Sequence, residues 1–413
     1  MVRTDNSVVD LDKVLISKEF LANPYPVLRE LREQDPIHWS DSIGGWILTR
    51  YDDMVNTFRD VERFSNEGRF ARSVEYLPAE SRSRLKAFED HYRTKGLLHS
   101  DPPDHTRLRS LVTKAFTPRM VEALRPRIQE LVNEFLDAGQ REGGMDVIPD
   151  LAVALPINVL AEILGSPAAD RVLFKGWADD LLAFQGVNKP GEGLLLQGQK
   201  ALLEVRAYLT DLIRKTRTQP GTNLISELVA AESQGEKLSE AELLNTCTTL
   251  LVAGHETTTS LIGNGIYTLL AHDDQWRQLK SEPQLLNPAI EETLRYESPV
   301  ARQPRLMKQD VELNGKHIAK GQMVYQMLNA ANRDPAQFEE PEKFDIRRQK
   351  NRHIAFGLGI HFCVGAVLSR TEGQIVFGTL MERAPELKLV SDTPAWDVTK
   401  PNSRMLKTLP VQF

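Results

Sequence analysis

One of the chain's two cysteines lies in a glycine-rich loop whose residue types suit metal ligation. Cys363 follows Phe356 and Gly359 and precedes Gly365, and a helical pattern begins at Ala366. A cysteine just before a helix N-terminus is stabilised as a thiolate by the helix dipole and the free backbone N–H groups, and a thiolate is the form that binds iron. The glycines let the backbone turn tightly beside the sulfur. Taken alone, however, a single cysteine is more often a small buried apolar side chain.

A second group of polar residues interrupts a long apolar helix. Ala253, Gly254, Glu256 and Thr257 follow one another within five positions of that helix. A mid-helix glycine costs about 1 kcal/mol of helix stability, and threonine hydroxyls compete for backbone carbonyls, so we expect a local kink or widening here. The alternative is an ordinary helix that carries a solvated glutamate.

The spacing Phe356-x-x-Gly359-x-His361-x-Cys363-x-Gly365 resembles the haem-binding loop of the cytochromes P-450, and every motif position matches. The resemblance implies a mainly α fold with a smaller β region. In that fold a haem b group (iron protoporphyrin IX) lies between a long central helix and the cysteine-bearing loop. It also implies that Cys363 is the axial metal ligand and that Phe356 shields its sulfur from water. Cys247, inside the long helix without such surroundings, is interpreted as a packing residue.

The glycine-bearing segment of the long helix is similar to the family's Ala-Gly-x-Asp/Glu-Thr pattern. By that resemblance Ala253 and Gly254 lie against the haem, Glu256 is the acid and Thr257 is the alcohol of a proton relay. A kink would make room there for dioxygen and water. The chemistry is consistent, because cleavage of the O–O bond needs delivered protons, whereas uncontrolled water would release peroxide.

Four basic residues resemble the family's ligands to the haem propionates, namely His105, Arg109, Arg305 and His361. Each would ordinarily be read as a surface residue. They come from three distant parts of the chain, and buried carboxylates need such cationic or hydrogen-bonding partners.

The family's Glu-x-x-Arg pair matches Glu292 and Arg295. A further arginine completes a buried structural cluster in the family, and counting back from the cysteine favours Arg348 over Arg347 for that place.

Hydrophobic periodicity and turn residues predict the elements that position these groups. We expect a β-hairpin within residues 36–51, and helices from residue 118, over residues 194–217 and over residues 239–271. The last of these starts with a capping-box pattern at Ser239 and Glu242. Short strands are expected over residues 310–324 and in the last twenty residues.

The composition is that of an ordinary globular protein. The 413 residues are 41% apolar and 26% charged, with a formal net charge of −6. This charge gives no electrostatic reason to bind nucleic acid or an anionic membrane. Two cysteines exclude a disulfide framework, and the N-terminal residues lack a signal peptide or an apolar span. We therefore expect one cytochrome P-450 domain over residues 1–413, cytoplasmic, without a membrane anchor and monomeric.

The resemblance further implies a monooxygenase of secondary metabolism that uses O2 to hydroxylate or epoxidise a hydrophobic small molecule. Polyketides or macrolides, terpenoids, steroids and fatty acids are the substrate classes common among bacterial members. A peroxide-driven peroxygenase, an oxidative coupling enzyme and a non-catalytic haem protein that binds a ligand are the alternatives.

Electrons are expected from NAD(P)H through a separate ferredoxin and ferredoxin reductase, because no dinucleotide-binding fingerprint is evident. A basic patch of Arg107, Lys114, Arg352 and Arg370 would dock the ferredoxin. The substrate pocket is expected to draw on residues 69–98, 185–196, 300–302 and 402–405, with Ala253. Within these segments Arg302 either faces the substrate or has a surface or propionate-side role.

Overall fold

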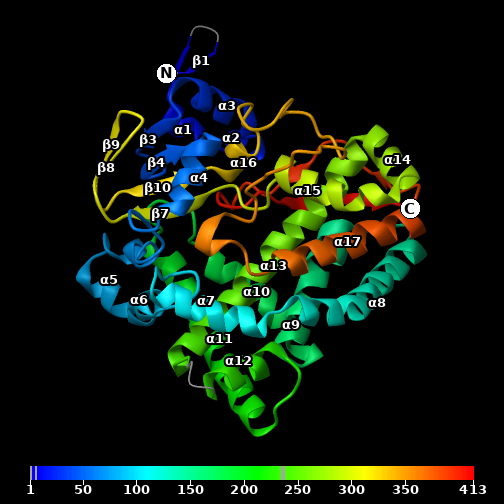
Figure 1. The fold of residues 1–413 in the computed structure, drawn as a ribbon, viewed down its shortest axis with the longest axis horizontal. Coiled ribbons are helices and arrows are strands. Elements are labelled where there is room, and N and C mark those ends of the chain that lie inside the picture. The colour runs from blue at the N-terminus through cyan, green and yellow to red at the C-terminus, as the bar shows by residue number, and fades with distance from the viewer. Residues whose placement is uncertain (1, 5–6, 234–237) are drawn as a thin grey trace.

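The computed structural model describes residues 2–4, 7–233 and 238–413, which form a mainly α fold with small sheets, the largest of them at one side (Figure 1), as predicted. The shorter helices are α1 (Leu11–Val14), α2 (Lys18–Ala22), α5 (Ala79–Arg84), α6 (Lys86–Arg93) and α16 (Leu328–Ala331). The longer helices are α3 (Tyr25–Gln34), α4 (Tyr51–Arg59), α7 (Asp104–Ala115), α8 (Pro118–Glu142), α9 (Ala154–Leu164), α10 (Arg171–Leu182), α11 (Glu192–Thr218), α12 (Leu224–Ser233), α13 (Glu240–Ala271), α14 (Asp273–Ser281), α15 (Leu286–Tyr296) and α17 (Ala366–Arg383).

The largest sheet joins two parts of the chain that are far apart in sequence. Its strand order is β3-β4-β10-β7-β5, with β4 and β10 parallel and the other neighbours antiparallel. The predicted hairpin is confirmed as β3 and β4, and the predicted strands near residues 310–324 and at the C-terminus are also present. The strands are β1 (Val2–Thr4), β2 (Ser7–Val9), β3 (Ile37–Ser40), β4 (Gly45–Leu48), β5 (Phe64–Ser65), β6 (Gly144–Asp146), β7 (Gln303–Met307), β8 (Val311–Leu313), β9 (Lys316–Ile318), β10 (Met323–Gln326), β11 (Lys388–Leu389), β12 (Ala395–Trp396), β13 (Leu406–Thr408) and β14 (Pro410–Gln412).

Helix α13 runs through the middle of the molecule (Figure 1) and has the start and length expected from the sequence. Ser239 and Glu242 form the predicted capping box, which satisfies two of the free N–H groups at the helix start. Its 32 residues span roughly 48 Å at the rise of an α-helix. The expected kink at Gly254 does not interrupt it, because every residue from Glu240 to Ala271 is α-helical.

Among the described residues three apolar clusters hold the helices and the sheet, the smallest of them around Phe88 and Phe184. The largest one packs α8, α9, α11, α15 and α17 around α13, and Cys247 is fully buried within it. This position confirms its role as an apolar packing residue, and burial raises the pKa of the Cys247 thiol to about 12. The second cluster lies under the largest sheet. Among the helices of the described residues, none is both long and apolar enough to span a bilayer.

Candidate functional site

The loop that carries Cys363 is closed by backbone contacts and needs glycine at specific places. The Cys363 N–H donates to the carbonyl of Phe356 at 3.0 Å. Gly359 has a φ of +72°, and a Cβ there would lie 2.9 Å from the carbonyl oxygen of Phe58. The prediction for Gly359 is therefore consistent with the structure. The expected turn is present at Gly365, but its φ of −80° does not require glycine, and a Cβ there would lie 3.9 Å from the Cys363 sulfur.

The sulfur of Cys363 lies at the start of α17, as the sequence predicted. Burial raises the pKa of this thiol, while the N–H groups of Gly365 and Ala366 and the nearby charges of Arg109 and Arg370 act to lower it. These lowering contacts all favour a thiolate over a thiol. Phe356 is half-buried beside the loop, and the Arg370 guanidinium lies 4.4 Å from the centre of its ring.

A cluster of basic side chains lies beside the cysteine loop. The rings of His105, on α7, and His361, in the loop, have centroids 4.0 Å apart. Both ring nitrogens of His105 and the Nε2 of His361 are buried and have no hydrogen-bond partner among the described residues. Burial, together with neighbouring His105, Arg305 and Arg109, lowers the pKa of His361 to about 2. Buried nitrogens of this kind require acceptors, so the cluster is suited to an anionic ligand.

Arg69 is a member of this cluster that the sequence did not identify. It acts electrostatically on His361 and Arg305, and its side chain is buried. From the sequence Arg69 was only the first residue of an expected substrate-pocket segment. No motif spacing marks it, because the fold alone brings it against Pro304, next to Arg305.

Helix α13 carries small and hydroxyl residues near its middle. Ala253 is exposed although it lies in the middle of the longest helix, and the Thr257 hydroxyl donates to the Ala253 carbonyl at 3.0 Å. Gly254 has a packing role, since a Cβ there would come within 2.7 Å of a methyl carbon of Leu160 on α9. Thr258 Oγ1 lies 3.3 Å from Ser369 Oγ, which links α13 directly to the helix that follows Cys363.

The carboxylate of Glu256 does not contact Thr257. One oxygen lies 2.7 Å from Lys400 Nζ, and the other accepts a hydrogen bond from Ser403. Lys400 also pairs with Asp179 on α10 at 3.1 Å. Two of the residues predicted as one relay are therefore held separately in this structure, and Lys400 and Ser403 are partners that the sequence did not reveal.

Comparison with known proteins identifies the fold. The cytochrome P450 family model matches residues 198–413. The chain is 41% identical over 390 residues to cytochrome P450 CYP107DY1 of Priestia megaterium, covering 92% of this chain and 93% of that protein. It is 41% identical over 412 residues to the cytochrome P450 monooxygenase PikC of Streptomyces venezuelae, covering 98% and 94%. The crystal structure of myxobacterial cytochrome P450 CYP267B1 with myristic acid is similar at a TM-score of 0.87 and 39% identity, covering 97% of this chain and 99% of that chain.

The chain belongs to the cytochrome P450 family. It has the P450 fold and is a P450 monooxygenase, and the family carries haem bound through a cysteine thiolate. The residues present fit this group. The buried, unpartnered nitrogens of His105 and His361 and the adjacent Arg305 offer donors to two carboxylates, and the thiol of Cys363 offers a sulfur ligand.

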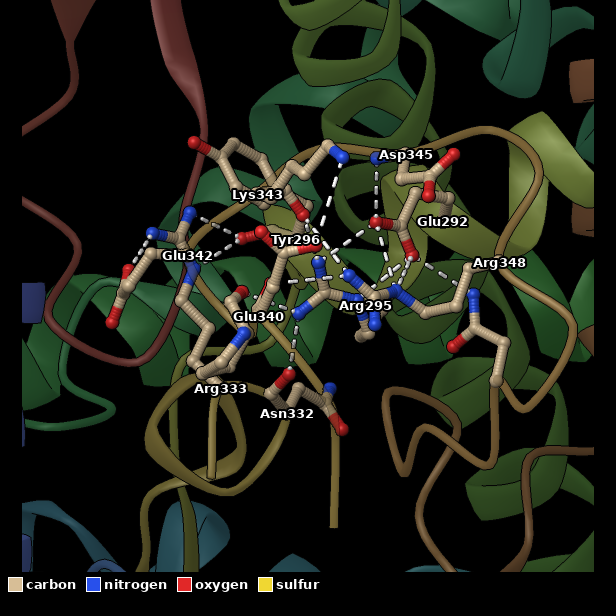
Figure 2. A network of polar contacts seen from close by, with 12 residues as sticks. Glu292, Arg295, Tyr296, Asn332, Arg333, Glu340, Glu342, Lys343, Asp345 and Arg348 are labelled. Carbon is tan, nitrogen blue, oxygen red and sulfur yellow. Dashed lines mark hydrogen bonds and ion pairs between the residues drawn. The ribbon is translucent and has the colours of Figure 1, made fainter. Parts of the chain in front are cut away.

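The P450 ion cluster on α15 is present as predicted (Figure 2). Arg295 binds both oxygens of Glu292 at 2.8 Å, and Arg348 Nε lies 3.1 and 3.2 Å from the same two oxygens. The side chains of Glu292 and Arg295 are completely buried. Arg347 instead pairs with Glu282 at the surface, so the preference for Arg348 is confirmed.

Arg302 is neither a surface residue nor a member of the basic cluster. Its Nε donates to Asn402 Oδ1 and its Nη2 donates to the Gly186 carbonyl, both at 2.8 Å. Its guanidinium also lies 5.2 Å from the centre of the Tyr325 ring. Arg302 thus ties the connection between α10 and α11 to the C-terminal loop of the P450.

The predicted basic patch near the cysteine is partly neutralised. Arg107 pairs with Glu242, and Arg370 binds both oxygens of Glu291 at 2.7 and 2.8 Å. Apolar side chains are exposed on the same loop and on the first turn of α17, namely Ile360, Phe362 and Val367. We call these three residues the apolar patch.

Proposed function

We propose that Cys363 is the axial ligand of a haem b group in this P450, and that His105, Arg109, Arg305 and His361 bind its propionates. The observation that carries the proposal is the convergence of a sulfur at a helix N-terminus with two histidines whose buried ring nitrogens lack partners among the described residues. Phe356 and Gly359 would shape the cysteine side, and Ala253 and Gly254 the opposite side. Thiolate-bound haem activates dioxygen for insertion of one oxygen atom into a C–H bond.

The protein's own contribution to this reaction is proton supply and exclusion of excess water. Thr257 Oγ1, which donates to the Ala253 carbonyl, can accept and pass on a proton by rotation of its hydroxyl group. We propose Glu256 as the acid that supplies this hydroxyl. Because its carboxylate is bound by Lys400 and Ser403, Glu256 must exchange these partners before it serves Thr257.

The proposed substrate is a hydrophobic small molecule of the polyketide or macrolide, terpenoid, steroid or fatty-acid type. Similar P450s bear names within this range, including polyketide biosynthesis cytochrome P450 PksS of Bacillus subtilis and the vitamin D(3) 25-hydroxylase of Pseudonocardia autotrophica. The myristic acid complex of CYP267B1 adds a fatty acid. Since Arg302 is already engaged by Gly186 and Asn402, it does not by itself favour a substrate carboxylate.

The proposed electron source is a ferredoxin with its NAD(P)H-dependent reductase, docking on the cysteine side. The apolar patch supports this choice, because exposed apolar side chains within a short stretch of chain beside Cys363 favour protein contacts.

Two measurements test the proposal. The reduced, carbon monoxide-bound protein should absorb near the wavelength that names the family, and Cys363→His should shift that band to the position typical of histidine-ligated haem. A wild-type protein without the thiolate band would refute Cys363 as the ligand. Compounds that displace the sixth iron ligand are candidate substrates. Their turnover should require ferredoxin and reductase. Equal turnover with peroxide alone would favour the peroxygenase alternative.

A further inference from the structure

Arg69 is a buried arginine that binds only neutral oxygen atoms. It is 7% exposed and follows β5 in the chain. Its Nη1 donates to the Pro304 carbonyl at 2.9 Å and its Nη2 donates to the Leu98 carbonyl at 3.2 Å, while its Nε is buried without a partner. The guanidinium also lies 4.6 Å from the centre of the Phe70 ring, which fixes its position. A rigid, buried cation with an unused donor is suited to an anionic partner.

A second buried arginine lies directly beside it. Arg305 is 3% exposed, and its Nη1 donates at 2.9 Å to the same Pro304 carbonyl that Arg69 uses. Two cations that share one acceptor repel each other, and burial together with this repulsion lowers the pKa of Arg69. The arrangement is unfavourable unless negative charge lies close to both guanidinium groups.

The protein itself supplies little of that negative charge. Over the described ranges, no carboxylate lies within ion-pair distance of Arg69 or Arg305. Asp101 attracts both arginines from farther away, but its carboxylate already binds Lys308 at 2.7 Å and also binds Ser65. The missing counter-charge must therefore come from a bound group.

We propose that Arg69 is a further propionate-binding residue of this P450, acting with Arg305 on one haem carboxylate. The inference rests on the proposed haem site and adds to it a residue from the segment before α5. The charge of Arg69 also lowers the pKa of His361, so Arg69 interacts electrostatically with another member of the basic cluster. The sequence-based placement of Arg69 in the substrate pocket is replaced by this assignment.

The test compares Arg69→Gln and Arg69→Lys with Arg302→Gln in the haem-loaded enzyme. Arg302 is a matched control, because it is also a buried arginine held by two neutral oxygens, yet it lies outside the basic cluster. The rate of haem transfer to excess apomyoglobin measures how tightly the haem is held. Loss of one charge-assisted hydrogen bond should make transfer from Arg69→Gln about tenfold faster. Arg69→Lys should be intermediate, and Arg302→Gln should match wild type.

A second readout separates binding from mere structural support. A nearby cation repels the oxidised iron more than the reduced iron, because the oxidised iron carries one more positive charge. Removing that cation should therefore lower the reduction potential of Arg69→Gln below that of Arg302→Gln. If Arg69→Gln transfers haem at the rate of Arg302→Gln and keeps its potential, the assignment is wrong, whatever its melting temperature. The carbon monoxide spectrum of the wild type tests the thiolate site separately, so the two failures are distinguishable.

Discussion

Lys400 Nζ lies 2.7 Å from Glu256 Oε2, so the C-terminal loop holds the acid of the central P450 helix. Glu256 is buried and Lys400 is one-quarter exposed on its side chain. Lys400 also pairs with Asp179 on α10, so one ammonium group joins the C-terminal loop, α10 and the central helix. The position of the proposed proton donor therefore depends on a residue outside the helix that carries it.

This pairing predicts strong coupling between the two side chains. Glu256→Gln and Lys400→Met should each lower stability by about 1–3 kcal/mol, because each removes one charge of a poorly solvated ion pair. The double variant should cost less than the sum of the two single changes. Denaturant unfolding of the four proteins gives the coupling energy. Additive losses would show that the ion pair contributes nothing to stability.

Thr257 should control how efficiently electrons are used. Thr257→Ala removes the hydroxyl that donates to the Ala253 carbonyl, and unregulated water in its place should release peroxide. NADPH consumption per product formed should rise several-fold with a supporting ferredoxin and reductase. Thr257→Ser keeps the hydroxyl group and should remain close to wild type. Unchanged coupling in Thr257→Ala would remove this residue from the proton relay.

The two neighbouring arginines after α16 should differ sharply in their effect on stability. Arg348→Leu breaks a buried contact with Glu292 and should destabilise the protein by about 3 kcal/mol. Arg347→Leu breaks an ion pair in which the arginine side chain is 48% exposed, and should cost at most about 0.5 kcal/mol. The two midpoints of denaturant unfolding provide the comparison. Equal losses would contradict the assignment of Arg348 to the buried cluster.

Glycine should be essential at one position of the cysteine loop and replaceable at another. Gly359→Ala forces a left-handed backbone on alanine and places its Cβ 2.9 Å from the Phe58 carbonyl, so we expect a loss of about 2 kcal/mol or more. Gly365→Ala meets neither obstacle and should fold with little loss. Melting temperature and the carbon monoxide band report both effects. A stable, fully thiolate-ligated Gly359→Ala would contradict the strain argument.

The sequence predicted those parts of the protein that depend on local spacing. The capping box at Ser239, the hairpin, the helix start after Cys363 and the choice of Arg348 all follow from neighbouring residues, and each agrees with the structure. The motif did not reveal that Gly365 has a backbone angle that other residues can also adopt.

The long-range partners could not be predicted in this way. Lys400 lies 144 positions from Glu256, and Arg69 lies 235 positions from the Pro304 carbonyl that it binds. No periodicity or motif relates positions so far apart, because such contacts are set by how the sheet and the helices pack together. The acidic partners of Arg107 and Arg370 were equally unpredictable. They partly neutralise the basic patch that the sequence predicted from the two arginines alone.

The neutralised arginines and the exposed apolar patch lead to a prediction about electron delivery. If a ferredoxin docks over Ile360, Phe362 and Val367, its KM should rise only weakly with ionic strength, because screening acts on exposed charges and hardly on apolar contacts. Val367→Asp should raise that KM at least about fivefold, since it buries a charge in the interface. Val172→Asp, at an exposed valine of α10, is the matched control and should leave the KM unchanged. Reduction kinetics with one ferredoxin at several salt concentrations measure both effects. A steep salt dependence with an unaffected Val367→Asp would instead support docking through the remaining basic residues.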